Sequence, residues 1–199
     1  MMEGIDVSYC QAGFDFRAAA DAGKEFCIVR IGRTRRDGQQ ELDDYFVDNI
    51  NGAKAAGMKL GIYFYSLATT EAEAAQEANW LLDTMHEYLD GVPLEAGIWL
   101  DVEAPCQLAL SPADLTATVM SWVNTMNAAG VYVGIYSYYS MFNDNFELGS
   151  IPGYVPLWVA NTASVNYLKV ENPELNIPVW QYSDAGNIAG INVDLDVWY

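Results

Sequence analysis

Two acidic residues stand one position apart at the end of an apolar run. Asp101 and Glu103 close the segment "GIWLDVE", which otherwise has the composition of a buried strand. Residues i and i+2 of a strand point to the same side, with Cα atoms roughly 6–7 Å apart, so these carboxyls share a face. Carboxylates this close repel, which raises one pKa and keeps that acid protonated near neutral pH. Cleavage of a glycosidic bond needs such a pair; the alternative is a strand that merely ends in acids.

Two further acids fall on the first and last apolar runs of the chain. Asp6 lies in "GIDVS" near the N-terminus, and Asp194 lies in "VDLDVWY" at the C-terminus. In a closed barrel of parallel strands, the first and last strands are neighbours, and functional residues gather at the C-terminal ends of the strands. We therefore expect Asp6, Asp101, Glu103 and Asp194 to surround one mouth of a barrel.

Aromatic residues also concentrate in or near the ends of the apolar runs. They are Tyr63, Tyr65, Trp99, Tyr136, Tyr138, Trp158, Trp180 and Tyr182. Sugar rings stack on aromatic faces, and tyrosine hydroxyls supply hydrogen bonds, so the cluster favours a carbohydrate site. The alternative is that these side chains only fill the barrel.

The elements that must position these residues are strands alternating with helices. Eight nearly continuous apolar runs are typical of strands covered on both faces: 4–8, 26–32, 59–67, 96–103, 131–138, 155–161, 177–183 and 193–199. Helical spacing is found at 42–57, 70–91 and 111–130. Thr70 with Glu73 is a capping box, and Ser111 followed by Pro112 is a helix start.

The last third of the chain breaks the alternation of strands and helices. Only nine residues, 184–192, separate the last two runs, and a parallel crossover needs at least about 10–12. We predict an α/β fold, a TIM-like barrel with a degenerate last third: about five βα units followed by three strands. Residues 1–199 are expected to form a single domain, because no linker or repeat divides them.

Composition and charge exclude several classes of partner. The net charge is −18, with nine Lys and Arg against 27 Asp and Glu, which argues against nucleic acid and anionic membranes. No apolar run reaches the roughly 18 residues of a membrane span. Three cysteines without a CxxC pattern predict neither a disulfide framework nor a zinc site. The N-terminus carries no secretory leader, so export by the general route would require that a leader has been removed.

The chain resembles glycoside hydrolase family 25, the Chalaropsis-type lysozymes or N-acetylmuramidases. The similarity runs from residue 4 to residue 199. It begins with "GIDVSYCQAGFDFRAAADAGKEFCIVRIG" and "DDYFVDNINGAKAAGMKLGIYFYSLATT", and continues through "IWLDVE", "GVYVGIYS", "LWVA", "WQYS" and "NVDLDVWY" in register. The resemblance implies a barrel enzyme without a cofactor that hydrolyses the β-1,4 bond between N-acetylmuramic acid and N-acetylglucosamine in peptidoglycan.

The resemblance also implies roles for individual residues. Glu103 becomes the general acid and Asp101 its partner, with Asp6 and Asp194 completing the acidic ring. The residues expected to bind substrate are Tyr63, Tyr65, Tyr136, Trp158, Gln181 and Arg30, of which Arg30 supports the acids. Many members have a His where this chain has Phe64, which affects one subsite contact. Repeats that bind the cell wall are absent from this sequence; either they lie elsewhere or the enzyme works without them.

The mechanism and two other functions stay open from the residues alone. The D-x-E spacing fits inverting pairs, but a 2-acetamido substrate can supply its own nucleophile, and we favour this retaining route with Asp101 assisting. A metal-dependent hydrolase would use the carboxylates, although such sites usually need several His and this chain has only His86. The third possibility is a non-catalytic glycan-binding barrel. We expect a monomer that acts outside the cell or is released to the wall, as phage-type enzymes are.

Overall fold

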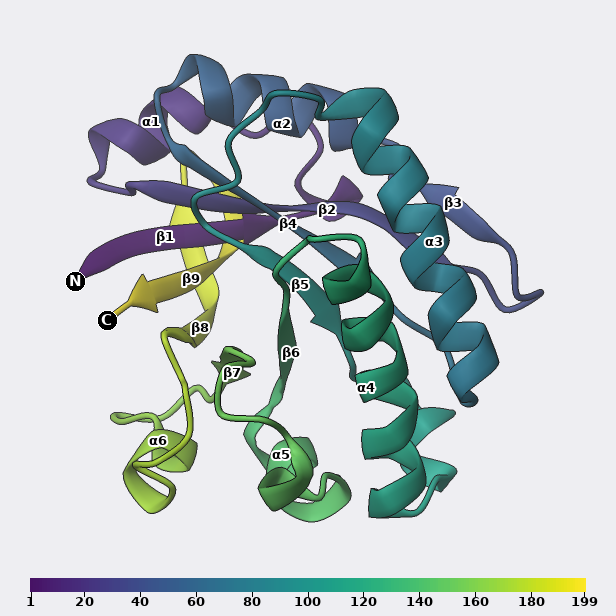
Figure 1. Cartoon of the computed structure of the whole chain (residues 1–199). Coiled ribbons are helices and arrows are strands. Elements are labelled where there is room, and N and C mark those ends of the chain that lie inside the picture. The colour runs from purple at the N-terminus through teal and green to yellow at the C-terminus, as the bar shows by residue number, and fades with distance from the viewer.

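A computed structural model describes all residues, 1–199, and its sheet closes into a barrel. Eight strands form the closed ring in the order β1, β9, β8, β7, β6, β5, β4, β2 (Figure 1). Their bounds are β1 Met2–Val7, β2 Phe26–Thr34, β4 Lys59–Tyr65, β5 Ile98–Asp101, β6 Gly134–Tyr138, β7 Leu157–Ala160, β8 Val179–Ile188 and β9 Ile191–Trp198. A short ninth strand, β3 (Gln40–Leu42), extends the sheet beyond β2. The predicted α/β barrel is confirmed.

Helices cover the outside of the barrel. They are α1 Phe16–Asp21, α2 Phe46–Ala55, α3 Glu71–Tyr88, α4 Pro112–Ala128, α5 Tyr139–Asn145 and α6 Tyr167–Glu171, with 3-10 turns at Tyr9–Gln11, Gln107–Ala109 and Leu148–Ser150. The predicted capping box of Thr70 and Glu73 opens α3, and Ser111 caps α4. In Figure 1, α3 and α4 lie side by side against one flank of the barrel.

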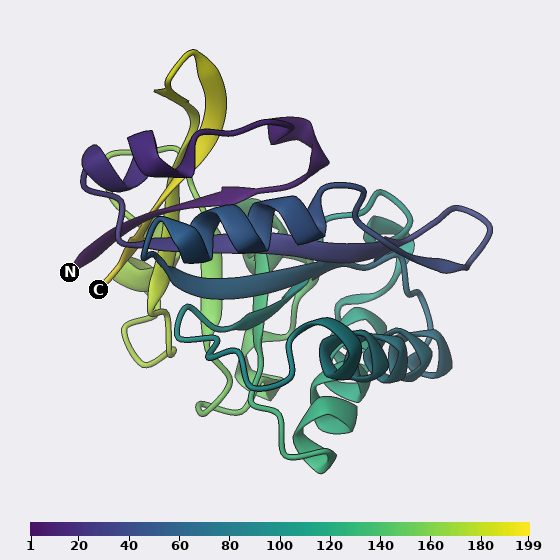
Figure 2. The same cartoon turned by 90° about the horizontal axis from the view of Figure 1, so that it is seen from above.

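The final third departs from the βα rhythm, as predicted. The connection between β8 and β9 is a tight hairpin, in which Ala189 and Gly190 both adopt positive φ. Strand β9 therefore runs antiparallel to both of its neighbours, β8 and β1. The crossover from β7 to β8 contains only the five-residue helix α6. The pairing of β1 with β9 closes the ring and places the two chain termini together (Figures 1 and 2).

The apolar core has two parts because strand residues alternate between the inside and the outside of the barrel. A cluster of 41 buried residues, including Ile5, Val29 and Leu100, lies between the strands and the helices. A separate cluster of eight fills the lower interior: Phe26, Ile28, Tyr63, Ala96, Trp99, Tyr136, Trp158 and Val179. The interior of the barrel is therefore filled with side chains, and aromatic rings form the floor beneath the mouth.

Inward-facing glycines make room for this aromatic floor. A Cβ atom on Gly134 would collide with the ring of Trp99, and one on Gly4 would collide with the ring of Phe26. Glycine normally destabilises the interior of a strand, but at these two positions the packing of the aromatic rings requires it.

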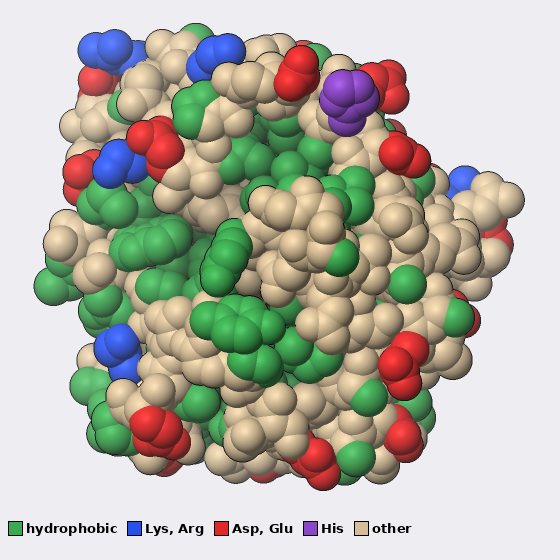
Figure 3. Space-filling view, in the orientation of Figure 1, with side chains coloured by type: hydrophobic (Ala, Val, Ile, Leu, Met, Phe, Trp, Pro, Cys, Tyr) green, Lys and Arg blue, Asp and Glu red, His purple; other side chains and the backbone are tan.

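Charged side chains lie mainly on the outer surface. Figure 3 shows carboxylates around the rim of the molecule, with apolar side chains gathered toward the hollowed middle of this face. No helix combines the length and the hydropathy needed to traverse a membrane.

Candidate active site

Asp101 and Glu103 lie at the mouth of the barrel, the end at which the parallel strands have their C-termini. Asp101 is the last residue of β5, and Glu103 follows two residues later. The backbone remains hydrogen-bonded to β6 beyond the end of β5. Val102 N–H donates to Tyr136 O (3.0 Å), and Ser137 Oγ–H donates to Val102 O. Asp101 is 4% exposed and Glu103 is half-buried. The predicted pair thus has one deeply buried and one accessible acid.

The pKa values of this pair reflect burial and mutual repulsion. Burial raises the pKa of Asp101 well above its ordinary value, the charge of Glu103 raises it further, and Arg30 lowers it. Burial also raises the pKa of Glu103, with a contribution from the charge of Asp194, and Arg30 again opposes the rise. The effect of Asp194 on Glu103 indicates that β9 and β5 face each other across the mouth. An accessible acid with a raised pKa keeps its proton to higher pH than an ordinary carboxyl does and is suited to proton donation.

Asp6 and Asp194 reach the mouth from strands at opposite ends of the chain. They are direct partners in the antiparallel register of β1 and β9, as barrel closure predicts. Burial, followed by the charges of Asp196 and Asp194, raises the pKa of Asp6 well above its ordinary value. Burial raises the pKa of Asp194 to about 6, with a contribution from Asp184. The four predicted acids therefore gather in one place.

Asp196 is a fifth carboxyl, which the sequence interpretation missed. It lies two residues beyond Asp194 on the same face of β9, has no exposed surface, and accepts a hydrogen bond from Trp158 Nε1–H (2.9 Å). Its Oδ2 is buried and has no hydrogen-bond partner, and Asp6 and Asp196 influence each other's pKa. Burial raises the pKa of Asp196 to about 7. The D-x-D spacing in "VDLDVW" was the available signal.

A hydrogen-bonded chain leads from Asp6 to the wall of the barrel. Gln181 Nε2–H donates to Asp6 Oδ2 (2.7 Å), and Tyr136 O–H donates to Gln181 Oε1 (2.9 Å). All three side chains are at most 9% exposed. Gln181 lies opposite Asp196 in the β8–β9 register. Gln181 and Tyr136 thus fix the position of Asp6 from the side.

Arg30 is the cation that acts on Asp101 and Glu103. Two nitrogens of its guanidinium, Nε and a terminal one, lie 2.7 and 2.6 Å from the same oxygen, Oδ2, of the buried Asp43. The guanidinium also lies 4.7 Å from the ring centroid of Tyr9. Burial disfavours its charge, but the pKa is still raised because Tyr63 and Asp43 favour the charge. Asp43 holds Arg30 in place; sequence reasoning missed this residue because it lies in a polar segment without strand spacing.

Some of the predicted aromatic residues form the floor and the wall of the site, whereas Trp180 and Tyr182 hydrogen-bond to Asn161 and Glu3 instead. Trp158 is 1% exposed and packs 4.4 Å from Tyr136 and 6.2 Å from Tyr63, measured between ring centroids, so its ring forms the floor. Tyr65 and Tyr136 flank Asp101 in register on β4 and β6. Tyr65 is half-buried, and burial together with the charges of Asp101 and Glu103 raises its pKa to about 12. Tyr65 is therefore the wall residue most open to a ligand.

The carboxyls do not assemble into a metal site. No three His, Cys, Asp or Glu side chains lie together in a way that could hold a metal ion. His86 lies in the last turn of α3 and is exposed.

The protein is an α/β barrel with carboxyls of raised pKa at its mouth. It therefore belongs to a class of proteins equipped for acid–base chemistry on a ligand held against aromatic side chains. The sequence model of the glycosyl hydrolases family 25 matches residues 5–191, and the chain belongs to this family. The resemblance noted in the sequence is thereby confirmed.

Several curated relatives carry lysozyme names. The chain is similar to an autolytic lysozyme of Clostridium acetobutylicum, with 30% identity over 98% of this chain and 55% of the relative. It is also similar to lysozyme M1 of Streptomyces globisporus, with 28% identity over 98% of this chain and 66% of the relative. The chain thus spans little more than half the length of the first of these relatives.

Solved structures show the same fold. The modular autolysin LytC of Streptococcus pneumoniae superposes with a TM-score of 0.83 and 25% identity, covering 100% of this chain and 46% of LytC. A family 25 glycosyl hydrolase of Bacillus anthracis superposes with a TM-score of 0.80 and 18% identity, covering 100% of this chain and 89% of that one.

Proposed function

We propose that this chain is a muramidase (lysozyme), which hydrolyses the β-1,4 bond between N-acetylmuramic acid and N-acetylglucosamine in bacterial peptidoglycan. Family membership over residues 5–191 and the lysozyme names of the relatives support this activity. A structure of the autolysin LytC, 26% identical to this chain, is described as a complex with a synthetic peptidoglycan ligand. The observation that carries the proposal is the accessible Glu103, with its raised pKa, beside the buried Asp101.

In this proposal Glu103 is the general acid. Its proton passes to the glycosidic oxygen as the bond from the anomeric carbon breaks, so the leaving sugar departs as a neutral alcohol. The half-buried position of Glu103 supports the role, since the acid must be desolvated enough to stay protonated and open enough to reach the bond. Arg30, held by Asp43, limits how far the pKa of the acid can rise.

Asp101 assists the substrate's own 2-acetamido group. Its Oδ1 is buried and has no hydrogen-bond partner, which leaves an acceptor free for the acetamido N–H. The acetamido oxygen bonds to the anomeric carbon while the glycosidic bond breaks. Water then displaces the acetamido oxygen from that carbon, which restores the acetamido group, and gives a proton to Glu103, which restores the acid.

This route predicts retention of configuration. Two displacements at the anomeric carbon release the product first as the β-anomer. Proton NMR of the anomeric signals during the first minutes of digestion measures the ratio of anomers before mutarotation. An initial α-anomer would contradict the route and favour direct attack by water.

Digestion of purified peptidoglycan with mass spectrometry of the products tests the activity. The proposal predicts fragments with N-acetylmuramic acid at the reducing end. Fragments that end in N-acetylglucosamine would contradict it and indicate a glucosaminidase. Glycan that binds the protein but stays intact would indicate a non-catalytic glycan-binding barrel.

We further propose that residues 1–199 form one catalytic domain that acts as a monomer on the wall, and therefore outside the cytoplasmic membrane. The closed barrel and the lysozyme and endolysin neighbours support this placement.

A further inference from the structure

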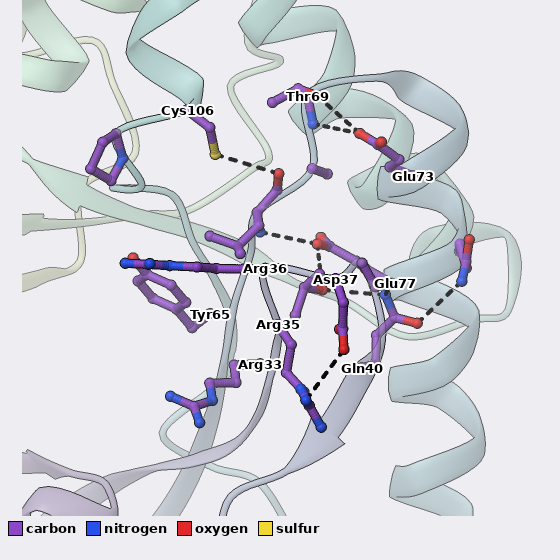
Figure 4. Close-up of a pocket in the computed structure, with 16 residues that line it drawn as sticks. Arg33, Arg35, Arg36, Asp37, Gln40, Tyr65, Thr69, Glu73, Glu77 and Cys106 are labelled. Atoms are coloured by element: carbon purple, nitrogen blue, oxygen red, sulfur yellow. Dashed lines mark hydrogen bonds and ion pairs between the residues drawn. The ribbon is translucent and has the colours of Figure 1, made fainter.

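A second cavity opens beside the acid cluster. Its volume is about 890 Å³, and its walls come from the hairpin between β2 and β3, the end of β4, the first turns of α3 and the segment after Glu103 (Figure 4). None of the four acids expected at the mouth lines it. The cavity is therefore adjacent to the proposed catalytic centre and distinct from it.

Tyr65 and Pro105 connect the cavity to the acids. Tyr65 lines the cavity and is the register partner of Asp101 on the neighbouring strand, and the charges of Asp101 and Glu103 contribute to its raised pKa. Pro105 lines the cavity two residues after Glu103. A ligand bound at the acids can thus extend past Tyr65 into the cavity without leaving the protein surface.

Cations gather in this cavity although the protein is strongly acidic. Arg33, Arg35 and Arg36 line it, three of only nine Lys and Arg in the chain. Two of them are already paired: Arg33 lies 2.7 Å from Glu41, and Arg35 lies 3.2 Å from Asp37. Arg36 is exposed and takes part in no hydrogen bond or ion pair. In Figure 4 its side chain points in the direction of Tyr65, and no dashed line ends on it.

The carboxylates that line the cavity are occupied by internal donors. Glu77 accepts hydrogen bonds from Thr34 Oγ1 (2.7 Å), Ser66 Oγ (2.6 Å) and the Leu67 amide (3.1 Å). Glu73 accepts from the amides of Thr69 and Thr70 in the capping box of α3. Asp37 is held by Arg35. Arg36 is therefore left as a cation without a protein counter-charge at the edge of a polar cavity.

We propose that this cavity binds the peptide stem of the substrate, with the Arg36 guanidinium pairing with a stem carboxylate. This inference rests on the proposed function, because the stem is attached to the lactyl group of the same muramic acid residue whose bond is cut. A guanidinium presents two parallel N–H donors that match a carboxylate, and the neutral Thr69 and Gln76 on the same wall suit peptide amides. A local cation would also offset the repulsion between a protein of charge −18 and an anionic wall.

Arg36→Gln, assayed on two forms of one substrate, tests the proposal. The first form is soluble, uncrosslinked peptidoglycan strands with their stems; the second is the same strands after an amidase has removed the stems and left the lactyl carboxylate. On stem-bearing strands we expect kcat/KM to fall roughly tenfold, mainly because KM rises. This is the size expected for the loss of one hydrogen-bonded ion pair between a guanidinium and a carboxylate. On stem-free strands the variant and the wild type should agree. Arg36→Lys should recover only part of the loss, because lysine keeps the positive charge but lacks the two parallel N–H donors of the guanidinium.

Arg17→Gln is the matched control. Arg17 lies on α1, and its side chain is 76% exposed and paired with Asp21, so this variant changes the net charge by the same amount at a distant site. It should leave both rates unchanged. An equal loss in both variants would overturn the proposal in favour of a general charge effect.

Three other results would overturn the stem proposal. An unchanged rate of Arg36→Gln on stem-bearing strands would show that Arg36 makes no contact with them, and an equal loss on both forms would assign Arg36 to the glycan or its lactyl carboxylate. A loss that appears on whole walls, but not on walls stripped of teichoic acid or on the soluble strands, would assign Arg36 to a phosphate. Failure of the wild type to cleave stem-free strands, together with intact stem-bearing strands, would count against the muramidase activity itself.

Discussion

At the scale of residues, the site is built from carboxyls that would repel one another if all were ionised. Asp6 and Asp196 form one pair, in which Gln181 donates to Asp6, Trp158 donates to Asp196 and the charge of Asp196 raises the pKa of Asp6. Asp101 and Glu103 form a second pair, in which the charge of Glu103 raises the pKa of Asp101. The spacing in "WLDVE" was enough to predict the second pair. The first pair depends on the register of β1, β9 and β8, which no single stretch of sequence reveals; for this reason Asp196 was missed.

Asp196→Asn tests whether Asp6 and Asp196 share a proton. The substitution removes a charge that raises the pKa of Asp6 and replaces it with an amide that can donate to the Asp6 carboxylate, so the pKa of Asp6 should fall. Titration of the Asp6 carboxyl carbon by NMR measures the change directly. An unchanged or higher pKa of Asp6 would show that the two carboxyls do not share a proton.

At the scale of elements, hydrophobic runs and capping residues were sufficient to predict the eight barrel strands and the helices α2, α3 and α4. The short helices α1, α5 and α6 were not predicted, because five to seven residues are too few for a helical period to stand out. The pairing of β3 with β2 was also missed, since "QEL" has no strand composition. These elements form because the barrel and its neighbours supply the contacts that the local sequence lacks.

Gly134→Ala tests the packing of the barrel interior. The added Cβ would collide with the Trp99 ring and lie 2.6 Å from the Pro156 carbonyl oxygen, so we expect a loss of about 1–3 kcal/mol in the free energy of unfolding, typical of overpacking. Gly153→Ala is the control, because its Cβ would meet nothing within 4 Å and its backbone needs no positive φ. Denaturant unfolding measures both variants. Equal stability of the two would contradict the packing account.

At the scale of the whole molecule, the buried acids make stability depend on pH. Asp194 and Asp196 have pKa values of about 6 and about 7 in the folded state, against an ordinary value of 3.8. Above their ordinary pKa the unfolded chain has lost protons that the folded chain still holds, so the stability that these acids contribute at low pH is lost as the pH rises through the folded values. Glu73, whose pKa is lowered mainly by backbone N–H groups, acts in the opposite sense, and only below about pH 4.5.

We therefore predict that the free energy of unfolding falls as the pH rises from about 4.5 to about 7. Each proton held only by the folded state contributes up to about 1.4 kcal/mol per pH unit to this slope. Urea unfolding at several pH values and constant salt measures the slope, and Asp196→Asn should make it shallower. A free energy that rises across this window would contradict the assignment of these acids as protonated in the folded protein.

The assignment of Glu103 as the general acid is tested most directly by kcat/KM on peptidoglycan for Glu103→Gln. Gln keeps the size of the side chain but carries no acidic proton, so we predict a fall of roughly 10²–10⁴-fold with an unchanged unfolding curve. Glu87→Gln, an exposed site near the end of α3, makes the same chemical change far from the mouth and should retain full activity. Activity of Glu103→Gln within threefold of the Glu87→Gln control would contradict the account.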